Sequence, residues 1–330
     1  MRGLSRSRVL VTGAGGFIGS HLCELCLAEG AAVRAYVHYN SRSDWGMLED
    51  LNKKSLEKIE IVAGDLRDAH SVRKAVRDCE YVFHLGALIG IPYSYSNPED
   101  VIRTNVLGTM NVLNACLEYG VVRMVHTSTS EVYGTALYVP MDEKHPLNPQ
   151  SPYAASKVGG DKIAESYYRT YGLPVVILRP FNTYGPRQSP RAVIPAIVIQ
   201  ALKFRSIRLG SLSPRRDLTF VKDTARGFLA AASAPKVEGR TIQIGSQQEH
   251  SVADLVALTE KILKKKLRII QDPGRRRPES SEVERLFASN ENARILLKWQ
   301  PKIKLENGLE RTIRWFRRHA DRYKSSLYHV

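Results

Sequence analysis

Residues 9–19 read VLVTGAGGFIG, an apolar run that ends in glycines and leads into a helical pattern. The glycines lack a Cβ atom, so the backbone can turn sharply and approach a ligand closely at this point. The helix that follows would offer free N–H groups and the positive end of its dipole, which suits a pyrophosphate. A place between a strand and a helix is the context that a dinucleotide site requires. The residues expected to contact such a cofactor are Gly13, Gly16, Phe17, Ile18 and Gly19.

Strand-like and helical segments alternate outward from this stretch through the first half of the chain. We predict strands at residues 9–12, 32–37, 59–63, 81–85, 123–127 and 174–178, and helices at 20–29, 69–76, 104–119 and 156–171. Such alternation predicts βαβ units and a parallel sheet. From about residue 183 onward, Pro and Gly break up the pattern. We therefore predict an α/β fold, with a doubly wound parallel sheet in residues 1–180. A smaller, partly interleaved substrate domain would come mainly from residues 181–330, with some segments returning to the sheet.

The composition is that of an ordinary globular protein, with 43% hydrophobic and 25% charged residues among 330. No apolar run approaches the roughly 20 residues that span a bilayer. The short basic N-terminus runs directly into the first strand, so we expect a cytoplasmic protein with no membrane partner. Cys23 and Cys26 have redox or zinc spacing, but no second pair of ligands follows, so we expect buried thiols and no metal site.

The formal net charge of +16 fits either an anionic small molecule or nucleic acid as the partner. Because no nucleic-acid-binding motif accompanies the basic residues, we expect no nucleic-acid partner.

The segment after the second strand bears on the choice of cofactor. The acid that usually takes the adenosine ribose hydroxyls is missing from the expected position at the strand end. With His38, Asn40 and Arg42 nearby, a 2′-phosphate is acceptable, although Arg42 could equally be an ordinary loop arginine. The cofactor is therefore NAD or NADP. Asp65 and Leu66, after the third strand, are placed to meet the adenine, and Asp65 or Asp68 could also cap the next helix.

A Tyr-x-x-x-Lys element, Tyr153 to Lys157, begins one of the predicted helices. The i, i+4 spacing places both side chains on one face of the helix. A neighbouring ammonium favours phenolate, so we expect the pKa of Tyr153 to fall from about 10 toward neutrality. That shift would make Tyr153 a base for a sugar hydroxyl. Thr129, after the strand at residues 123–127, could orient the same substrate oxygen.

Several motifs follow one another in the order seen in extended short-chain dehydrogenases/reductases, which the chain resembles over nearly its whole length. They are the glycine loop, HLGA at 84–87, NxxGT at 105–109, STSEVYG at 128–134, YxxxK at 153–157, RPFNxYGP at 179–186, and Arg216-Asp217 with Val221 and Asp223. The resemblance implies a Rossmann fold, a tightly bound NAD or NADP that Leu85 and Ala87 would also contact, and a nucleotide-sugar substrate. Hydride would leave sugar C4 while Tyr153 takes the C4 hydroxyl proton.

Within this family, the chain most resembles the 4,6-dehydratases of N-acetylglucosamine nucleotides in legionaminic acid type pathways. The segments YNSR at 39–42, DWG at 44–46, TSTSEVYG at 127–134, FNTYGPRQS at 181–189 and RPExSEVER at 277–285 carry this resemblance. It implies that a 4-keto group acidifies the C5 proton, that a base removes this proton, and that the C6 hydroxyl leaves as water. The hydride then returns to C6. Glu131 is the base implied.

One departure from the pattern concerns Ser130. Glucose-nucleotide 4,6-dehydratases carry Asp-Glu at this place, and the Asp protonates the leaving hydroxyl, whereas this chain has Ser130-Glu131. Either Glu131 acts as base and then acid, or a water assists. The Ser-Glu pair also resembles that of UDP-glucuronate decarboxylases, which need no second acid, and Arg191 could hold the substrate carboxylate of such an enzyme.

The residues expected to bind the substrate are polar and lie mainly in the second half of the chain. Asn182, Arg187, Arg216 and Arg277 are candidates for the diphosphate and nearby hydroxyls, because guanidinium binds phosphate bidentately. Each arginine alone could be a solvated surface charge. Tyr93 would line the sugar pocket or serve as a packing residue.

Four readings of the function remain open from the sequence. The chain is expected to be a 4,6-dehydratase of UDP- or GDP-N-acetylglucosamine, ahead of a UDP-glucuronate decarboxylase and a nucleotide-sugar 4-epimerase. A non-enzymatic NADP sensor would need none of Thr129, Tyr153 and Lys157, which argues against it. Family members often form homodimers through two long helices, which here would be residues 104–119 and 156–171.

Overall fold

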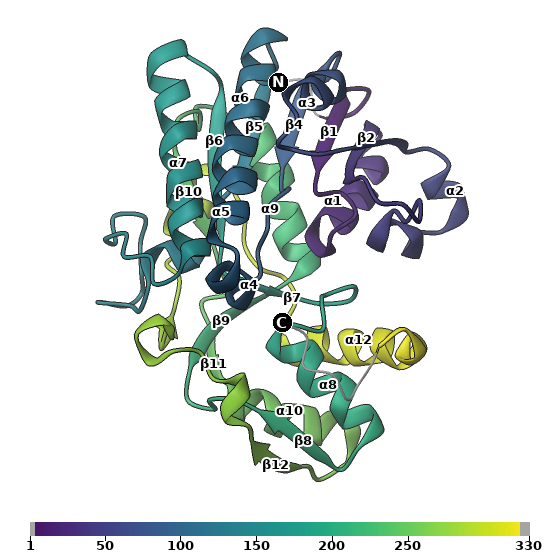
Figure 1. Cartoon of the computed structure of the whole chain (residues 1–330), viewed down its shortest axis with the longest axis vertical. Coiled ribbons are helices and arrows are strands. Elements are labelled where there is room, and N and C mark those ends of the chain that lie inside the picture. Colours follow the sequence, from purple (N-terminus) through teal and green to yellow (C-terminus); the bar gives the residue numbers. More distant parts are fainter. Residues whose placement is uncertain (1–3, 324–330) are drawn as a thin grey trace.

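A seven-stranded parallel sheet organises the computed structural model, which describes residues 4–323 (Figure 1). The strand order is β10-β6-β5-β4-β1-β2-β3. The strands are β1 (Arg8–Thr12), β2 (Ala32–His38), β3 (Glu60–Gly64), β4 (Tyr81–His84), β5 (Arg123–Thr127), β6 (Val175–Pro180) and β10 (Thr241–Ile244). The order reverses direction between β1 and β4, and a ligand site is expected at the carboxyl ends of the strands there. The predicted Rossmann fold is confirmed.

Helices cover both faces of this sheet (Figure 1). On one face, α1 (Phe17–Ala28) packs against α9 (Val221–Ser233), and on the other α6 (Gly108–Glu118) packs between α3 (Ala69–Val76) and α7 (Pro152–Tyr171). Alternate residues of each strand serve the two faces: Val9 and Val11 join the α1 side of the core, and Leu10 joins the α3 side. Burial on both faces explains why the strands are nearly continuous apolar runs.

The first lobe also contains several short helical elements in the connections between its strands and helices. They are η1 (Gly46–Asp50), α2 (Lys53–Leu56), α4 (Ile91–Ser96), α5 (Pro98–Ile102), the π-helical turn η2 (Arg103–Leu107) and η3 (Ser130–Tyr133).

The predicted strands and helices match the observed ones closely, with two informative differences. The helix predicted at 104–119 begins as the π-helical turn η2, and Thr109 Oγ1, in the first turn of α6, donates to the Asn105 carbonyl at 2.6 Å. The helix predicted at 156–171 begins earlier, at Pro152, because Ser151 caps it by accepting from the Ala154 N–H at 3.1 Å. Tyr153 therefore lies in the first turn of α7.

A second lobe lies beyond the carboxyl edge of the sheet (Figure 1). One small sheet joins β7 (Asn182–Tyr184), β9 (Arg215–Phe220), β11 (Glu249–Ser251) and β13 (Arg285–Leu286), and a pair joins β8 (Ser206–Leu209) and β12 (Arg268–Gln271). The helices are α8 (Val193–Lys203), α10 (Val252–Leu263), α11 (Glu291–Leu296) and α12 (Leu305–Arg318), with single turns η4 (Pro273–Arg275), η5 (Glu279–Ser281) and η6 (Ala320–Arg322). Because α9 and β10 return to the large sheet, segments of the two lobes alternate along the sequence. The domain boundary at residue 180 stays a prediction.

Two buried carboxylates fasten the lobes together. Asp223, at the start of α9, accepts from the N–H groups of Lys302 and Ile303 at 2.9 and 2.8 Å, just before α12 begins. Asp217, on β9, accepts from the Ser246 N–H at 2.5 Å and from the Ala288 N–H at 3.3 Å. Burial raises the pKa of Asp217 to about 6, although these hydrogen bonds oppose the shift. The carboxylates thereby hold the second lobe against the strand ends.

All four cysteines, including Cys23 and Cys26, are buried free thiols. Within residues 4–323, no group of three or more His, Cys, Asp or Glu side chains is arranged to hold a metal ion. None of the helices in the same range is long and apolar enough to cross a bilayer.

Candidate active site

The glycine loop after β1 has the shape that a pyrophosphate requires. Gly13 has a φ of +67°, and a Cβ there would lie 2.8 Å from the backbone of Gly86. A Cβ on Gly19 would collide with the Gly13 carbonyl. Gly16 precedes the first turn of α1, with Phe17 and Ile18 following, and no side chain caps this helix end. Uncapped N–H groups at a helix start beside a loop that excludes side chains fit the diphosphate of a dinucleotide.

The turn after β4 closes over the glycine loop. Thr12 Oγ1 accepts from the Gly86 N–H at 3.0 Å, and the Leu85 N–H donates to the Thr12 carbonyl at 3.3 Å. Leu66 packs so closely against Gly86 that a Cβ on this glycine would lie only 2.8 Å from Leu66 Cδ1. Leu85 and Leu66 thus lie at the turn that closes over the glycine loop, and cofactor contacts by these residues and by Ala87 stay predictions.

The loop after β2 is built by Asn40. Its Oδ1 accepts from the N–H groups of Arg42 and Asp44, both at 3.1 Å, and its Nδ2 donates to the Asp44 carbonyl at 2.7 Å. The loop packs on the glycine loop, where the Met47 N–H donates to the Gly15 carbonyl at 2.8 Å. Arg42 is exposed and lies 3.6 Å from the Asp44 carboxylate. Asp44 is an acid near the glycine loop. The sequence analysis gave it no role in cofactor binding, because it lies several residues after the end of β2.

His38 and Asp65 lie together at the ends of β2 and β3, with 3.8 Å between His38 Nε2 and the Asp65 carboxylate. Asp65 accepts from Arg67, and this hydrogen bond lowers the pKa of the carboxyl. The helix cap is provided by Asp68, which accepts from the His70 N–H at 2.9 Å. Asp65 therefore does not cap α3, and its carboxylate remains at the sheet edge.

The predicted catalytic residues converge at the carboxyl ends of β5 and β6. Thr129 caps η3 by accepting from the Glu131 N–H at 3.3 Å, and its hydroxyl also hydrogen-bonds with Tyr153. Ser130 is 2% exposed and Glu131 8% exposed, so both lie inside the site. Lys157 lies one turn after Tyr153 on the same face of α7, and both are buried.

The pKa expected for Tyr153 is wrong for this structure. Burial raises the pKa of the phenol, the Glu131 and Asp161 carboxylates raise it further, and the hydrogen bond with Thr129 opposes them. Burial also lowers the pKa of Lys157 to about 8, against the charge of Asp161, which raises it. The i, i+4 spacing correctly places Tyr153 and Lys157 on one face of the helix. It does not show that both groups are buried, and burial has the largest effect on both pKa values.

Asp161, one further turn along α7, is the residue that sequence reasoning missed. Its carboxylate accepts from Ser128 Oγ at 2.5 Å and from Arg179 Nη2 at 2.8 Å, and it lies 3.2 Å from His126 Nε2. Burial would raise the pKa of Asp161, but the His126 hydrogen bond and the Arg179 charge hold it well below its usual range. A fully buried carboxylate is thus charged, and it lies on the helix face that carries Lys157.

The same network fixes the turn that carries Glu131. Arg179 Nη1 donates to the Tyr133 hydroxyl at 2.6 Å, and this hydroxyl donates to Gln243 Oε1 at 2.9 Å. Tyr133 ends η3, Arg179 lies on β6 and Gln243 on β10. The position of Glu131 therefore depends on contacts with the ends of two strands, β6 and β10, which is how a catalytic carboxylate is kept in a defined orientation.

Two of the predicted substrate arginines meet beside Glu131. Arg277 Nη1 lies 3.9 Å from the Glu131 carboxylate and 3.7 Å from that of Glu282, and Arg216 Nη2 lies 3.3 Å from Glu282. Arg216 comes from β9, and Arg277 and Glu282 come from the segment around η5. Glu282 was not singled out from the sequence, since nothing in its local pattern shows that it reaches the arginines.

The other predicted substrate residues are more dispersed. Asn182 Oδ1 is buried and has no hydrogen-bond partner among residues 4–323, which suits a ligand contact. Arg187 turns toward α1 and lies 3.3 Å from Glu24. Arg191 is exposed, with Nη1 close to Gly90 in the turn after β4. The Tyr93 hydroxyl donates to Asp100 at 2.8 Å. Substrate contacts by these residues stay predictions.

The charge of Asp161 makes a pH-dependent prediction. Because this charge raises the pKa of Lys157, Asp161→Asn should lower that pKa below its value of about 8. The ammonium is lost as pH rises through the pKa, so the alkaline fall of kcat in the expected sugar oxidation should move to lower pH. A pH–rate profile of the variant measures this shift. Glu165→Gln, the same kind of change one turn further at a carboxylate paired with Lys162, is the matched control. A folded Asp161→Asn protein with an unmoved alkaline limb would contradict the assignment.

Comparison with known proteins adds relatives of defined activity. The family model described as GDP-mannose 4,6 dehydratase matches residues 10–312. UDP-glucose 4-epimerase of Mycolicibacterium smegmatis is 34% identical over 317 residues, covering 94% of this chain and 98% of the relative. The dTDP-D-glucose 4,6-dehydratase of Mus musculus is 30% identical over 332 residues, covering 97% and 91%.

A solved structure is similar over almost the same range. UDP-glucuronic acid 4-epimerase of Bacillus cereus, in complex with UDP-glucuronic acid and NAD, has a TM-score of 0.85 and 28% identity, covering 94% of this chain and 99% of that chain. The family match spans both lobes and includes the glycine loop, η3 and the start of α7. The chain therefore belongs to the GDP-mannose 4,6-dehydratase family, the nucleotide-sugar epimerases and dehydratases among the short-chain dehydrogenases/reductases.

Proposed function

We propose that this protein is an NAD(P)-dependent 4,6-dehydratase of UDP- or GDP-N-acetylglucosamine. The observation that carries the proposal is the buried carboxylate of Glu131, held in η3 beside Tyr153 and Thr129. A dehydratase needs a base at sugar C5 in addition to the group that acts at C4, whereas a 4-epimerase needs only the latter. Glu131 is available for that second proton transfer.

The residues divide the reaction between them. Thr129 orients the C4 hydroxyl and Tyr153 takes its proton, with Lys157 favouring the phenolate. A bound nicotinamide would supply the hydride acceptor for C4 and the hydride donor for C6, and a proton from solvent would complete the C5–H bond. Once C4 is a ketone, Glu131 removes the acidified C5 proton and the C6 hydroxyl leaves as water.

Ser130 cannot readily donate a proton, so the leaving hydroxyl needs another acid. Glu131 becomes a carboxylic acid when it accepts the C5 proton, and it can then deliver that proton to the C6 oxygen. Arg277, whose Nη1 lies 3.9 Å from Glu131, can stabilise the carboxylate before and after the transfer. One carboxylate acting in succession thus replaces the usual pair of acid and base.

We assign NAD rather than NADP as the better cofactor. Arg42 is the nearest candidate for a 2′-phosphate, but the Asp44 carboxylate lies 3.6 Å from it and offsets its charge. The glycine loop, Leu66, Leu85 and Asp65 would hold the parts of the cofactor common to both. The glucuronic acid epimerase of similar fold was solved with NAD.

A nucleotide-sugar 4-epimerase is the second candidate. Ser130 favours it, because the site then lacks the separate acid that a dehydratase usually has. Several relatives are named epimerases, including that of Mycolicibacterium smegmatis. Arg191, close to Gly90, would suit a uronate carboxylate, as a glucuronate decarboxylase or epimerase needs. A cytoplasmic location also stays a prediction from the sequence.

Replacement of Glu131 separates these functions. Glu131→Gln should lower dehydration by at least about 100-fold, because general acid–base catalysis contributes that much. It should still reduce the bound cofactor with substrate, because C4 oxidation does not use Glu131. Tyr153→Phe should abolish both steps. Cofactor absorbance in a single turnover and product mass measure the two steps. A Glu131→Gln protein with full dehydration would contradict the assignment, and unchanged C4 epimerisation would favour the second candidate.

We also propose that the protein forms a homodimer through α6 and α7, which lie side by side (Figure 1). Leu107 and Leu117 are exposed at the two ends of the α6 segment, and Tyr168 and Tyr171 are exposed at the end of α7. Light scattering after size exclusion should give twice the chain mass of 37.0 kDa. Leu107→Glu with Tyr171→Glu should give the monomer, because charges in an apolar interface are unfavourable. A wild-type monomer at micromolar concentration would contradict the proposal.

A further inference from the structure

The end of the second lobe formed by β8 and β12 is strongly basic, and no step of the reaction uses it. These strands lie at one end of the molecule, away from the large sheet (Figure 1). The side chains that define this basic end come from the segments at the ends of α8, α10 and α12. They are Lys203, Arg205, Arg208, Lys265, Lys266, Arg268 and Arg317.

The pairing of β8 with β12 sets two of these arginines on one exposed face. Ile207 on β8 is buried, so its neighbour Arg208 points the other way, to the outside. In the parallel register Arg268 lies opposite Ser206 and Ile270 opposite Arg208, so Arg208 and Arg268 share the outward face. Arg205 precedes β8, and its carbonyl accepts from the Arg268 N–H at 2.8 Å. Three guanidinium groups therefore lie on a four-residue pair of strands.

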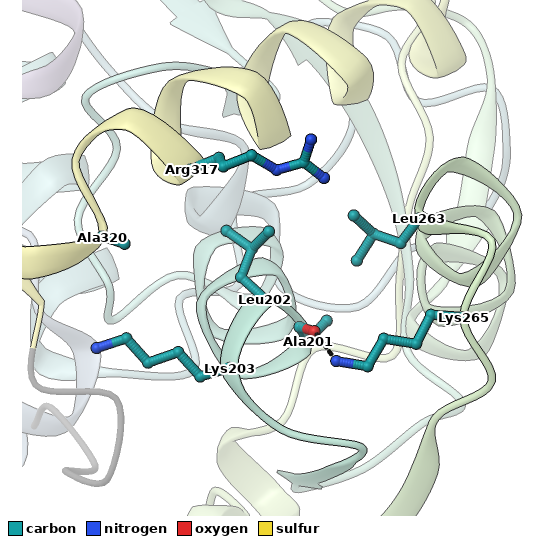
Figure 2. Close-up of a pocket in the computed structure, with 7 residues that line it drawn as sticks. All are labelled: Ala201, Leu202, Lys203, Leu263, Lys265, Arg317 and Ala320. Atoms are coloured by element: carbon teal, nitrogen blue, oxygen red, sulfur yellow. Dashed lines mark hydrogen bonds between the residues drawn. The ribbon is translucent and has the colours of Figure 1, made fainter.

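A shallow pocket of about 280 Å³ adjoins this face (Figure 2). Leu202 and Leu263 form its apolar floor, and Lys203, Lys265 and Arg317 stand around it from three different segments. Lys203 comes two residues before Arg205, and Lys265 comes three residues before Arg268, so each of the two segments runs from the pocket to the strand pair.

Part of this charge has an internal explanation. Lys203 Nζ donates to the Tyr323 carbonyl at 3.5 Å, and Lys265 Nζ donates to the Ala201 carbonyl at 2.7 Å. Cations at helix C-termini interact favourably with the helix dipole. The helix-dipole account also covers Arg317, in the last turn of α12, but it does not extend to Arg205, Arg208 and Arg268. Within residues 4–323 no carboxylate lies within ion-pair distance of Arg205, Arg208, Arg268 or Arg317, and Lys266 has only Glu260, at 3.6 Å.

Apolar side chains are exposed among these cations. Phe204, between Lys203 and Arg205, is 43% exposed. Ile270, opposite Arg208 on the outward face of the strand pair, is half-buried. An aromatic and an aliphatic side chain surrounded by unpaired cations match the interface of an anionic bilayer, where rings and alkyl groups enter the headgroup layer and cations meet phosphate. Nucleic acid would use the cations, but it offers no place for the isoleucine.

We propose that the basic end docks on membranes that contain anionic phospholipid. The contact is peripheral, through Phe204, Ile270 and the surrounding cations. It uses none of the residues placed in the active site, which lies at the carboxyl edge of the large sheet. The proposal does not depend on which nucleotide sugar the enzyme converts.

Vesicle binding by the whole protein tests this proposal. The protein should sediment with vesicles of phosphatidylcholine containing about one third phosphatidylglycerol, and not with phosphatidylcholine alone. Binding should weaken between about 0.1 and about 0.5 M salt, because screening shortens the range of the attraction. The triple variant Arg205→Glu, Arg208→Glu, Arg268→Glu should bind the anionic vesicles at least about tenfold less tightly.

Two controls make the result specific to the basic end. Lys53→Glu, Lys54→Glu and Lys58→Glu together reverse the same number of exposed charges around α2, and this variant should bind as the wild type does. Phe204→Ser removes no charge and should weaken binding at high salt, where apolar insertion remains. Equal loss in both triple variants, or tighter binding to single-stranded RNA than to the anionic vesicles, would overturn the proposal. If the arginine variant unfolds in a thermal scan, Arg→Gln at the same three positions replaces it.

Discussion

The active-site edge depends on one constraint: the Asp161 carboxylate is charged and fully buried, so it must be neutralised where it lies. Ser128, His126 and Arg179 meet this need from β5 and β6, and in doing so they fix α7 against the strand ends. The helix carries the tyrosine and lysine of the catalytic pair on the same face. Removal of one partner of a buried ion pair leaves an uncompensated charge, which costs far more than the pair contributes.

This constraint also explains the division of labour around the sugar. Arg179 neutralises Asp161 and, with its other nitrogen, donates to Tyr133, so a single guanidinium links α7 to the turn that carries Glu131. The second lobe brings Arg277 next to Glu131, and Arg216 lies close by. The hydrogen bonds accepted by Asp217 and Asp223 hold this lobe in place. Hydroxyl, carboxylate and guanidinium groups from both lobes thereby face one region.

Much of this could be predicted from the sequence, and the rest could not for physical reasons. Local patterns, such as the glycine turn and the strand and helix periodicities, gave the sheet and the helix that carries Tyr153. The pKa of Tyr153 was mispredicted because spacing shows proximity to Lys157 but not burial. Asp161 follows Lys157 at the same i, i+4 spacing, so that signal was present. Glu282 gave none, since its contacts with Arg216 and Arg277 depend on how the second lobe folds back.

The most direct test of the account is the mass of the product formed in heavy water from UDP- and GDP-N-acetylglucosamine with NAD. A 4,6-dehydratase with Glu131 at C5 predicts a product that has lost one water and gained one deuterium at C5, with the original C4 hydrogen found at C6. A product of unchanged mass that carries the inverted C4 configuration and no deuterium would contradict it and identify an epimerase.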